Sequence, residues 1–218
     1  VRRAAFALAL PWAALTVIVY VMALAGGFVR TWGRDWTFTL QHFRRAFALE
    51  WTMDGRLLFA GGAWNSLFTT VELAAIAAPI TAALGLLAAW VLSRHQFRGR
   101  TALEFALMLT FAVPGTVIGV AYILTYNVPP LEITGTAVIL VACFVFRNMP
   151  VGVRSGMAAM SQLDRSLDEA SATLGASTFR TLRRVVMPLL KPAILTALVY
   201  SFVRAMTTVS AVIFLVSA

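Results

Sequence analysis

The chain has 218 residues, of which 60% are hydrophobic and only 12% are charged, and its mean hydropathy is +0.83. Since soluble domains carry about 25% charged residues, this composition excludes an ordinary soluble domain and predicts an all-α polytopic membrane protein. The net charge of +9 would suggest nucleic-acid binding in a soluble protein, but here arginines cluster between apolar segments, so topology explains them and no nucleic-acid partner is expected.

The first predicted transmembrane span covers residues 1–28. Arg2 and Arg3 precede the uncharged segment Ala4–Phe28, whose 25 residues are enough to cross a bilayer with some tilt. A signal peptide is the alternative, because basic residues precede an apolar core. The segment is longer than a typical signal core, and no clear cleavage site is followed by a soluble domain. We therefore favour a retained transmembrane helix.

Residues 29–64 are polar and aromatic, and we expect them to form an extracytoplasmic loop. Leu40, Phe43 and Phe47 recur at helical spacing beside a pair of arginines, which indicates a short interfacial helix lying on the bilayer. A loop helix packed on the other spans fits the same pattern. The tryptophans of this segment also suit a membrane–water interface; they are Trp32, Trp36, Trp51 and Trp64.

Residues 65–218 are predicted to form the membrane core. Their apolar segments are long enough for four more spans, the fourth of which must continue past Arg147 to reach a sufficient length. The chain therefore has about five spans. The four segments are Leu73–Leu92, Phe105–Tyr126, Ile133–Val153 and Ala193–Ala218.

Two of these spans contain residues that are unusual in a membrane helix. Pro114 removes a helical hydrogen bond, and Gly115 and Gly119 allow another backbone to come close. Such a break could line a translocation path, or it could be a kink packed on neighbouring helices. Arg204 lies about twelve residues into an apolar span, where a charge faces the protein interior or water. It either pairs with an acid such as Glu104 or guides an anionic or chelated substrate.

The long polar segment of the C-terminal half, Asp164–Pro192, is predicted to form two short helices hinged at Gly175. Polar side chains at its start can cap a helix, and Asp168 and Glu169 then lie in the first turns, where the helix dipole favours acids. Glycine can adopt the left-handed conformation that ends a helix. A second helical segment starts at Thr178, and prolines break it.

Basic residues predict the orientation of the five spans. Eleven or twelve of the lysines and arginines fall on one side of the membrane, and the five on the other side all lie in residues 29–64. The positive-inside rule therefore places the N-terminus and the loop 154–192 in the cytoplasm.

Within this loop, seven residues follow a regular pattern: Glu169-Ala170-Ser171, three residues, Gly175, nine residues, Val185, one residue, then Met187-Pro188. The pattern resembles the EAA loop of ABC-transporter permeases, E-A-A-x3-G-x9-I-x-L-P, with every spacing kept. The resemblance implies a coupling helix that enters a groove on a cytoplasmic ATPase dimer. The implied coupling residues are Glu169, Ala170, Ser171, Leu174, Gly175, Val185 and Pro188.

The flanking spans resemble type I binding-protein-dependent importers, and residues 111–119 and 200–210 are most similar to ferric-iron permeases. The resemblance implies the type I ABC importer transmembrane-domain fold, with about five of six expected spans and with the chain as the C-terminal half of a fused permease. It also implies a bacterial inner-membrane location amid lipid, a second permease half and an extracytoplasmic substrate-binding protein. No cofactor is expected in this chain; ATP-Mg would bind the ATPase, a separate partner. Permeases for polyamine, thiamine, sulfate or phosphonate share much of this layout, so the ferric substrate has alternatives.

Other classes of function fit less well. An ion-gradient-driven secondary carrier would need buried acids along its spans, and only Glu72 and Glu104 come near, both close to span ends. A membrane anchor without transport would explain the spans but not the spacing of the loop. No enzyme active site or metal site is predicted, because the candidate ligands Cys143, His42 and His95 are isolated in the sequence.

Overall fold

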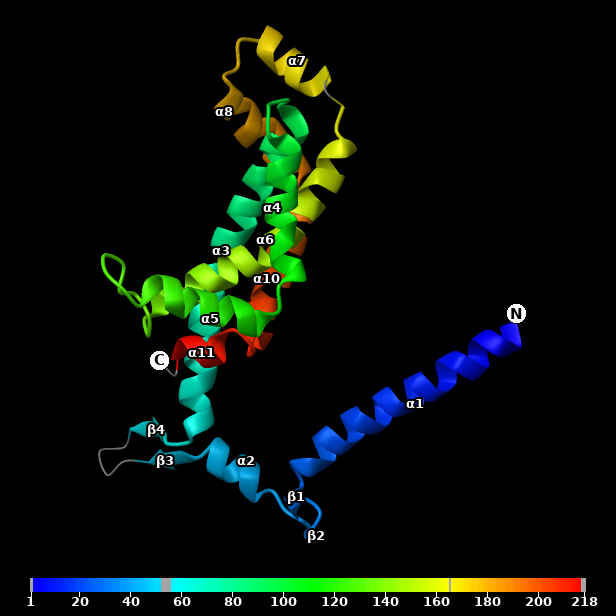
Figure 1. Ribbon diagram of the computed structural model, residues 1–218, viewed down its shortest axis with the longest axis vertical. Coiled ribbons are helices and arrows are strands. Elements are labelled where there is room, and N and C mark those ends of the chain that lie inside the picture. Colours follow the sequence, from blue (N-terminus) through cyan, green and yellow to red (C-terminus); the bar gives the residue numbers. More distant parts are fainter. Residues whose placement is uncertain (1, 52–55, 165, 217–218) are drawn as a thin grey trace. The chain divides into compact units, whose positions relative to one another are not determined.

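The computed structural model describes residues 2–51, 56–164 and 166–216, most of which are helical (Figure 1). The chain divides into two compact units, Val1–Thr69 and Thr70–Ala218, which we describe one at a time. Val1, where the predicted first span starts, lies outside the described residues, as do residues 52–55 of the predicted loop and Arg165.

The first unit consists of one long helix followed by short elements. Helix α1 (Arg2–Gly26) is apolar enough to cross a membrane over Ala9–Gly26. A helix is present where the spacing of Leu40, Phe43 and Phe47 predicted one, and this is α2 (Gln41–Ala46). Its contact with the membrane surface stays a prediction.

The fold is mostly helical, as predicted, but two short antiparallel hairpins that the sequence did not indicate flank α2. The strands are β1 (Val29–Thr31), β2 (Asp35–Phe38), β3 (Leu49–Trp51) and β4 (Leu57–Phe59). Aromatic contacts hold them in place: the ring centroid of Phe38 in β2 lies 5.9 Å from that of Phe28, and the ring centroid of Phe59 in β4 lies 5.2 Å from that of Trp64. The hairpins are therefore local structures fastened by ring packing.

Helix α3 (Gly62–Arg94) begins in the first unit and continues into the second, which is otherwise built from helices. Three described helices are long and apolar enough to cross a membrane, or up to five if each of two bent pairs counts as one span. The upper number equals that of the five predicted spans, but the second bent pair joins Thr178–Leu189, part of the predicted polar loop, to Lys191–Thr207. The main helices of the second unit after α3 are α4 (Arg100–Ala112), α5 (Gly115–Tyr126), α6 (Ala137–Ser161), α10 (Lys191–Thr207) and α11 (Val212–Val216).

The predicted third span, Phe105–Tyr126, is not one straight helix. Helix α4 ends before Val113, Pro114 has an extended backbone (φ −56°, ψ 142°), and α5 leaves at an angle of 110° to α4. Proline lacks the N–H that would continue the ladder and pushes the preceding residue out of the helical region. The last predicted span is also interrupted, because α10 ends at Thr207.

Small residues allow α3 and α6 to pack with their backbones in contact. A Cβ on Gly85 would lie 3.0 Å from the Cα of Gly152 and 3.1 Å from the carbonyl oxygen of Met149. One turn further, a Cβ on Gly156 would lie 2.6 Å from that of Ala89. Close approach of this kind replaces the hydrophobic effect as the source of helix association in a membrane.

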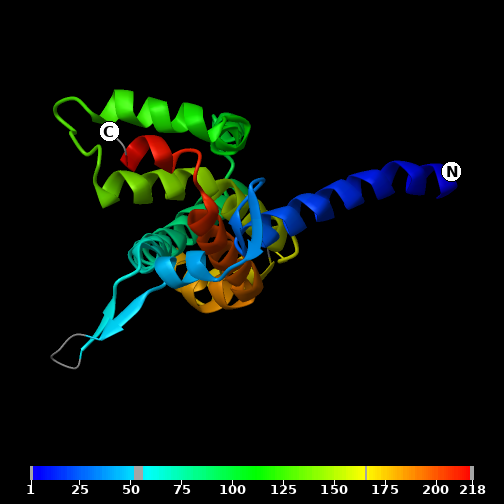
Figure 2. The same cartoon turned by 90° about the horizontal axis from the view of Figure 1, so that it is seen from below.

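Helix α10 runs antiparallel to α6 along the same core. Ala205, late in α10, packs in one buried cluster with Val145, early in α6, whereas Leu190, just before α10, packs with Met160 near the end of α6. At one end of this bundle the short helix α11 lies between α5 and the start of α6 (Figure 2), where Leu215 is buried in a cluster with residues of both. The two interrupted spans therefore meet at their breaks.

Candidate functional site

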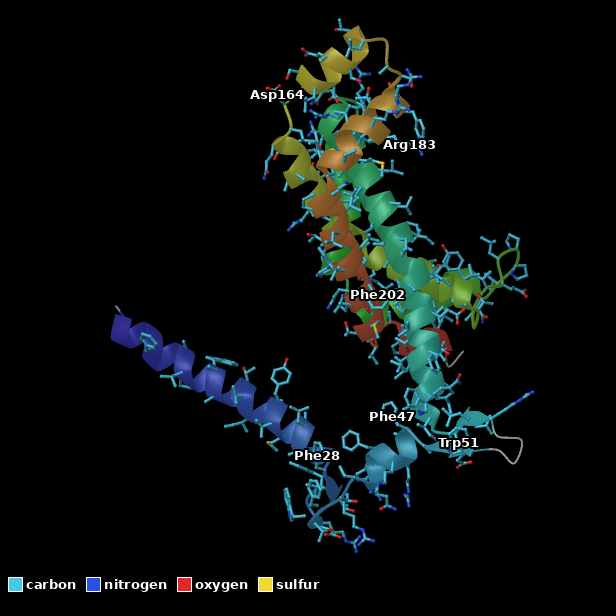
Figure 3. The ribbon with its side chains drawn as sticks, turned by 180° about the vertical axis from the view of Figure 1, so that it is seen from behind. Phe28, Phe47, Trp51, Asp164, Arg183 and Phe202 are labelled. Atoms are coloured by element: carbon cyan, nitrogen blue, oxygen red, sulfur yellow. The ribbon has the colours of Figure 1, made fainter. Side chains whose placement is uncertain are left out.

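The polar loop folds into two helical arms that we call the polar hairpin (residues 166–189). Its first arm is α7 (Ser166–Thr173), and its second arm runs through α8 (Thr178–Thr181), the π-helical turn η1 (Leu182–Val186) and α9 (Met187–Leu189). Figure 3 shows Asp164 and Arg183 at the same end of the second unit, with Phe202 further along the bundle. The two helices and the hinge that the sequence predicted are present.

Local hydrogen bonds explain why the chain turns where it does. The Ser166 N–H donates to the Asp164 carboxylate at 2.9 Å, and this bond, with the side chain of Ser166 and the charge of Arg94, lowers the pKa of Asp164. Gly175 has φ +73°, a left-handed conformation that side chains disfavour. The Ser177 hydroxyl then accepts from the Arg180 N–H and caps the second arm.

The two arms are joined by one side-chain hydrogen bond. The hydroxyls of Ser171 and Thr181 lie 2.7 Å apart, and both residues are partly buried. The alanine usual in the EAA pattern could not make this contact. Ser171 therefore links the two arms inside the polar hairpin and is not part of its outer surface.

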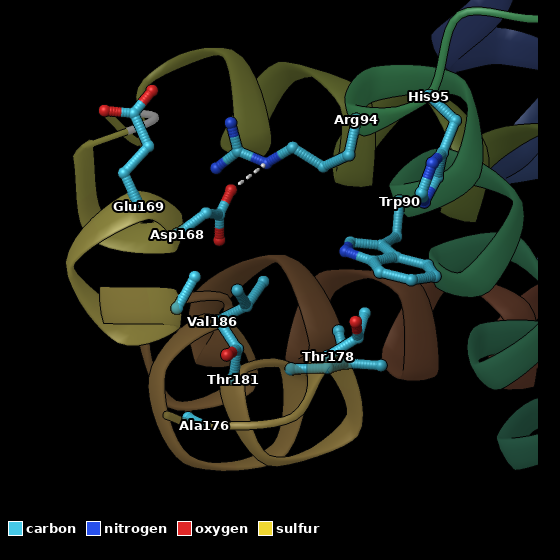
Figure 4. Close-up of a pocket in the computed structure, with 11 residues that line it drawn as sticks. Trp90, Arg94, His95, Asp168, Glu169, Ala176, Thr178, Thr181 and Val186 are labelled. Carbon is cyan, nitrogen blue, oxygen red and sulfur yellow. Dashed lines mark ion pairs between the residues drawn. The ribbon is translucent and has the colours of Figure 1, made fainter. Parts of the chain in front are cut away.

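A partly buried ion pair fastens the polar hairpin to the end of α3. The Arg94 Nε lies 3.0 Å from the Asp168 Oδ2, with side-chain exposures of 11% and 32%. Figure 4 shows this pair beside a cavity of about 290 Å³ that is also lined by Trp90 and Thr178, whereas the Glu169 carboxylate extends away from Arg94. The ion pair connects a membrane helix directly to the first arm.

The apolar side chains at the tip of the polar hairpin are uncovered in this chain. Leu174 is 86% exposed and Phe179 is 70% exposed. Glu169, Ala170 and Gly175 are exposed beside them. Exposed apolar residues grouped on a polar loop mark a contact surface for another protein.

The remaining predicted coupling residues lie closer to the membrane core. Val185 is partly buried, but its neighbour Val186 is the anchor, 2% exposed and packed with Met160 and Leu190. Pro188 is exposed in α9. Sequence reasoning missed Arg94, Trp90 and Phe179; the exposed phenylalanine in a polar loop was the one available signal.

The residues predicted for a translocation path are only partly brought together. Gly115 is buried, and a Cβ there would collide with the Ser210 hydroxyl and lie 2.8 Å from Arg147 Nη1. Gly119 packs against the carbonyl of Ala211, since a Cβ would lie 2.7 Å from it. Pro114 is exposed at the break. These residues form one contact region between α5, α6 and the segment before α11.

Arg204 does not join this contact region. It lies in the last turn of α10 and is exposed in this chain. Two ion pairs form among the described residues, and the pair with Glu104 that the sequence suggested is not one of them. An ion pair between Arg204 and Glu104 is therefore not formed in the described structure, and the role of Arg204 stays a prediction.

Exchanging the charges of Arg94 and Asp168 tests the ion pair. We expect Arg94→Asp or Asp168→Arg alone to lower the free energy of unfolding by about 1–3 kcal/mol, because each leaves two like charges in a partly buried place. The double exchange should recover at least half of this loss. Thermal unfolding of the purified protein in detergent measures all three variants, and additive losses would contradict the pairing.

The fold and this site define a multi-pass α-helical membrane protein with a polar hairpin that exposes apolar side chains at its tip. The chain belongs to the family of binding-protein-dependent transport system inner membrane components, whose model matches residues 81–218. The type I ABC importer membrane fold implied by the sequence resemblance is thereby confirmed.

Curated relatives agree with this family. The chain is 50% identical over 207 residues to a protein of Haemophilus influenzae named as a ferric transport system permease, and 49% identical to the ferric transport system permease protein FbpB of Actinobacillus pleuropneumoniae. Each match covers 95% of this chain but only 32% and 29% of those proteins, so the chain spans about a third of their length. It is also 31% identical to the sulfate transport system permease protein CysT of Salmonella typhimurium, over 67% of this chain and 56% of that protein.

Proposed function

We propose that this chain is the membrane-spanning part of an ATP-driven importer and that its polar hairpin docks on a cytoplasmic ATPase dimer. The observation that carries the proposal is the exposed apolar tip, Leu174 and Phe179, on a hairpin whose interior is tied by hydrogen bonds and an ion pair. A hairpin that is tied internally and exposes apolar side chains at its tip is suited to fit a groove on a partner and to act as a lever. ATP-Mg would bind the ATPase and not this chain.

In this proposal residues 1–28 form the first span, residues 29–64 an extracytoplasmic loop, and residues 65–218 the permease core with the cytoplasmic loop 154–192. The N-terminus of the chain lies in the cytoplasm, an orientation that the distribution of arginines supports. An extracytoplasmic binding protein delivers substrate to the outer side, and a second permease half completes the path. ATP binding drives alternating access because it favours one of two discrete states.

Ferric iron is the substrate that we favour. The two relatives named for ferric transport are 49–50% identical over nearly the whole chain, whereas the relative named for sulfate transport is 31% identical over two thirds of it. Sulfate is the second candidate. Iron here is cargo that the binding protein would present.

Substituting Glu169→Lys tests the docking surface. Glu169 is exposed and extends away from the Arg94–Asp168 pair, so the change should leave the fold intact. We expect ATP-dependent uptake of labelled iron by reconstituted vesicles to fall at least about tenfold, because a lost charge-assisted contact is worth about 1.5–3 kcal/mol.

The matched control for this experiment is Glu132→Lys, an exposed acid between α5 and α6 and outside the polar hairpin. The control should transport like the unmodified protein and retain its ATPase. Undiminished uptake by the Glu169→Lys variant would count heavily against the docking surface. Absence of ATP-dependent uptake by the unmodified transporter would count against the proposed function itself.

A further inference from the structure

Arg147 is a cation in the middle of a membrane helix, and no acid among the described residues forms an ion pair with it. It is the eleventh residue of α6 and is partly buried. Its Nη1 atom is fully buried and has no hydrogen-bond partner, and neither of the ion pairs among the described residues includes it. Charged groups in a membrane are costly and mark functional sites by default.

The guanidinium group is directed at the place where the two interrupted spans meet. A Cβ on Gly115 would lie 2.8 Å from Arg147 Nη1 and 3.1 Å from Nη2, and it would collide with the Ser210 hydroxyl. Gly115 is the first residue of α5, and Ser210 lies in the break between α10 and α11. Helices α5 and α6 and the segment between α10 and α11 therefore bring donors to one point.

Two features of this point favour negative charge. The guanidinium is a permanent cation with a planar set of donors. Pro114, the N-cap residue of α5, makes no hydrogen bond through its side chain, so it provides no capping acceptor for the first N–H groups of the helix. The positive end of the helix dipole lies at the same place. In transporters, the N-termini of interrupted helices commonly face anionic groups of the substrate.

We infer that Arg147, Ser210 and the first turn of α5 bind an oxyanion group of the transported substrate. This inference rests on the proposed transport function and adds the chemical class of the cargo. A bare ferric ion would be repelled by an unpaired guanidinium, whereas iron ligated by an oxyanion, or a free oxyanion, would be attracted. The cargo therefore crosses with a negatively charged oxygen group facing Arg147.

Phosphate protection of Arg147 tests the site directly on the complete transporter in detergent. Phenylglyoxal modifies accessible arginines, and peptide mass spectrometry measures the rate at each one. Inorganic phosphate at about four times its dissociation constant should slow modification of Arg147 about fivefold, whereas chloride at equal ionic strength should not. Arg204 is the internal control, because it is exposed on α10. Equal rates at Arg147 with and without phosphate, or equal slowing at both arginines, would overturn the inference.

Uptake measurements distinguish the sources of the oxyanion. Arg147→Gln should lower ATP-dependent uptake at least about tenfold through loss of a charged hydrogen-bond donor, and Arg147→Lys should retain more, while the ATPase still co-purifies. Labelled phosphate entering in a fixed ratio with labelled iron indicates an oxyanion bound to iron; labelled phosphate entering without iron indicates a free oxyanion. Full uptake by Arg147→Gln contradicts the site. If even the unmodified protein shows no ATP-dependent uptake, the proposed function fails, and phosphate protection still decides the site.

Discussion

Replacing Gly175 with tryptophan is expected to abolish ATP-driven uptake while the membrane helices stay folded. The residue has φ +73°, and no atom lies within 4 Å of the position that a Cβ would take. Strain from a side chain at this conformation costs about 1–2 kcal/mol, which the chain can tolerate. We expect the larger effect to be on docking, because an indole at the tip of the polar hairpin would occupy the space of the proposed ATPase partner. Uptake by reconstituted vesicles and co-purification of the ATPase measure it.

Two controls separate bulk from strain. Gly175→Ala carries the same backbone strain without the bulk and should keep most of the uptake. Gly99→Trp introduces the same bulk at another glycine with positive φ (+93°) and open space, outside the polar hairpin, and should also transport. Equal losses in all three variants would mean that strain or general damage, not docking, explains the result.

The second large effect is expected at the contact of α3 with α6. Gly85→Leu should destabilise the protein by about 3 kcal/mol or more, since overpacking at backbone contacts cannot be relieved by rotating a side chain. The atoms that a Cβ would meet at 3.0–3.1 Å are backbone atoms of Gly152 and Met149. Thermal unfolding in detergent and the yield of folded protein measure the loss.

Gly62→Leu is the matched control for this change. It lies in the same helix, at its first residue, and no atom lies within 4 Å of a Cβ placed there. We expect unchanged stability. If Gly85→Leu unfolded at the temperature of the control, the two helices would be less closely packed than described.

Local signals made the polar hairpin predictable from the sequence. Capping side chains, the glycine hinge at 175 and the start of the second helix at Thr178 all act within a few residues, so the chain alone specifies them. The Arg94–Asp168 pair joins residues that are far apart in sequence, and nothing in the pattern selects this arginine over its neighbours. Tertiary contacts of this kind need the structure.

The breaks in the membrane helices could not be predicted from the composition of the apolar segments. Residues on both sides of Pro114 are equally apolar, so hydropathy describes one long segment whether the helix is straight or bent by 110°. The hairpins of the first unit were hidden for another reason. Strands of three or four residues are too short to show an alternating pattern, and ring contacts such as that of Phe38 with Phe28 stabilise them.

The glycine contacts between α3 and α6 also limit how the protein can change shape. The closely packed backbones of α3 and α6 resist sliding. Each step along the helix axis would drive Cβ atoms of α3, such as that of Ala89, into the backbone of α6 near Gly156. Bending is cheaper where the hydrogen-bond ladder is already open, at Pro114 and after Thr207. In the alternating access proposed above, we therefore expect α3 and α6 to turn as a single rigid pair, with α5 and α11 moving around them.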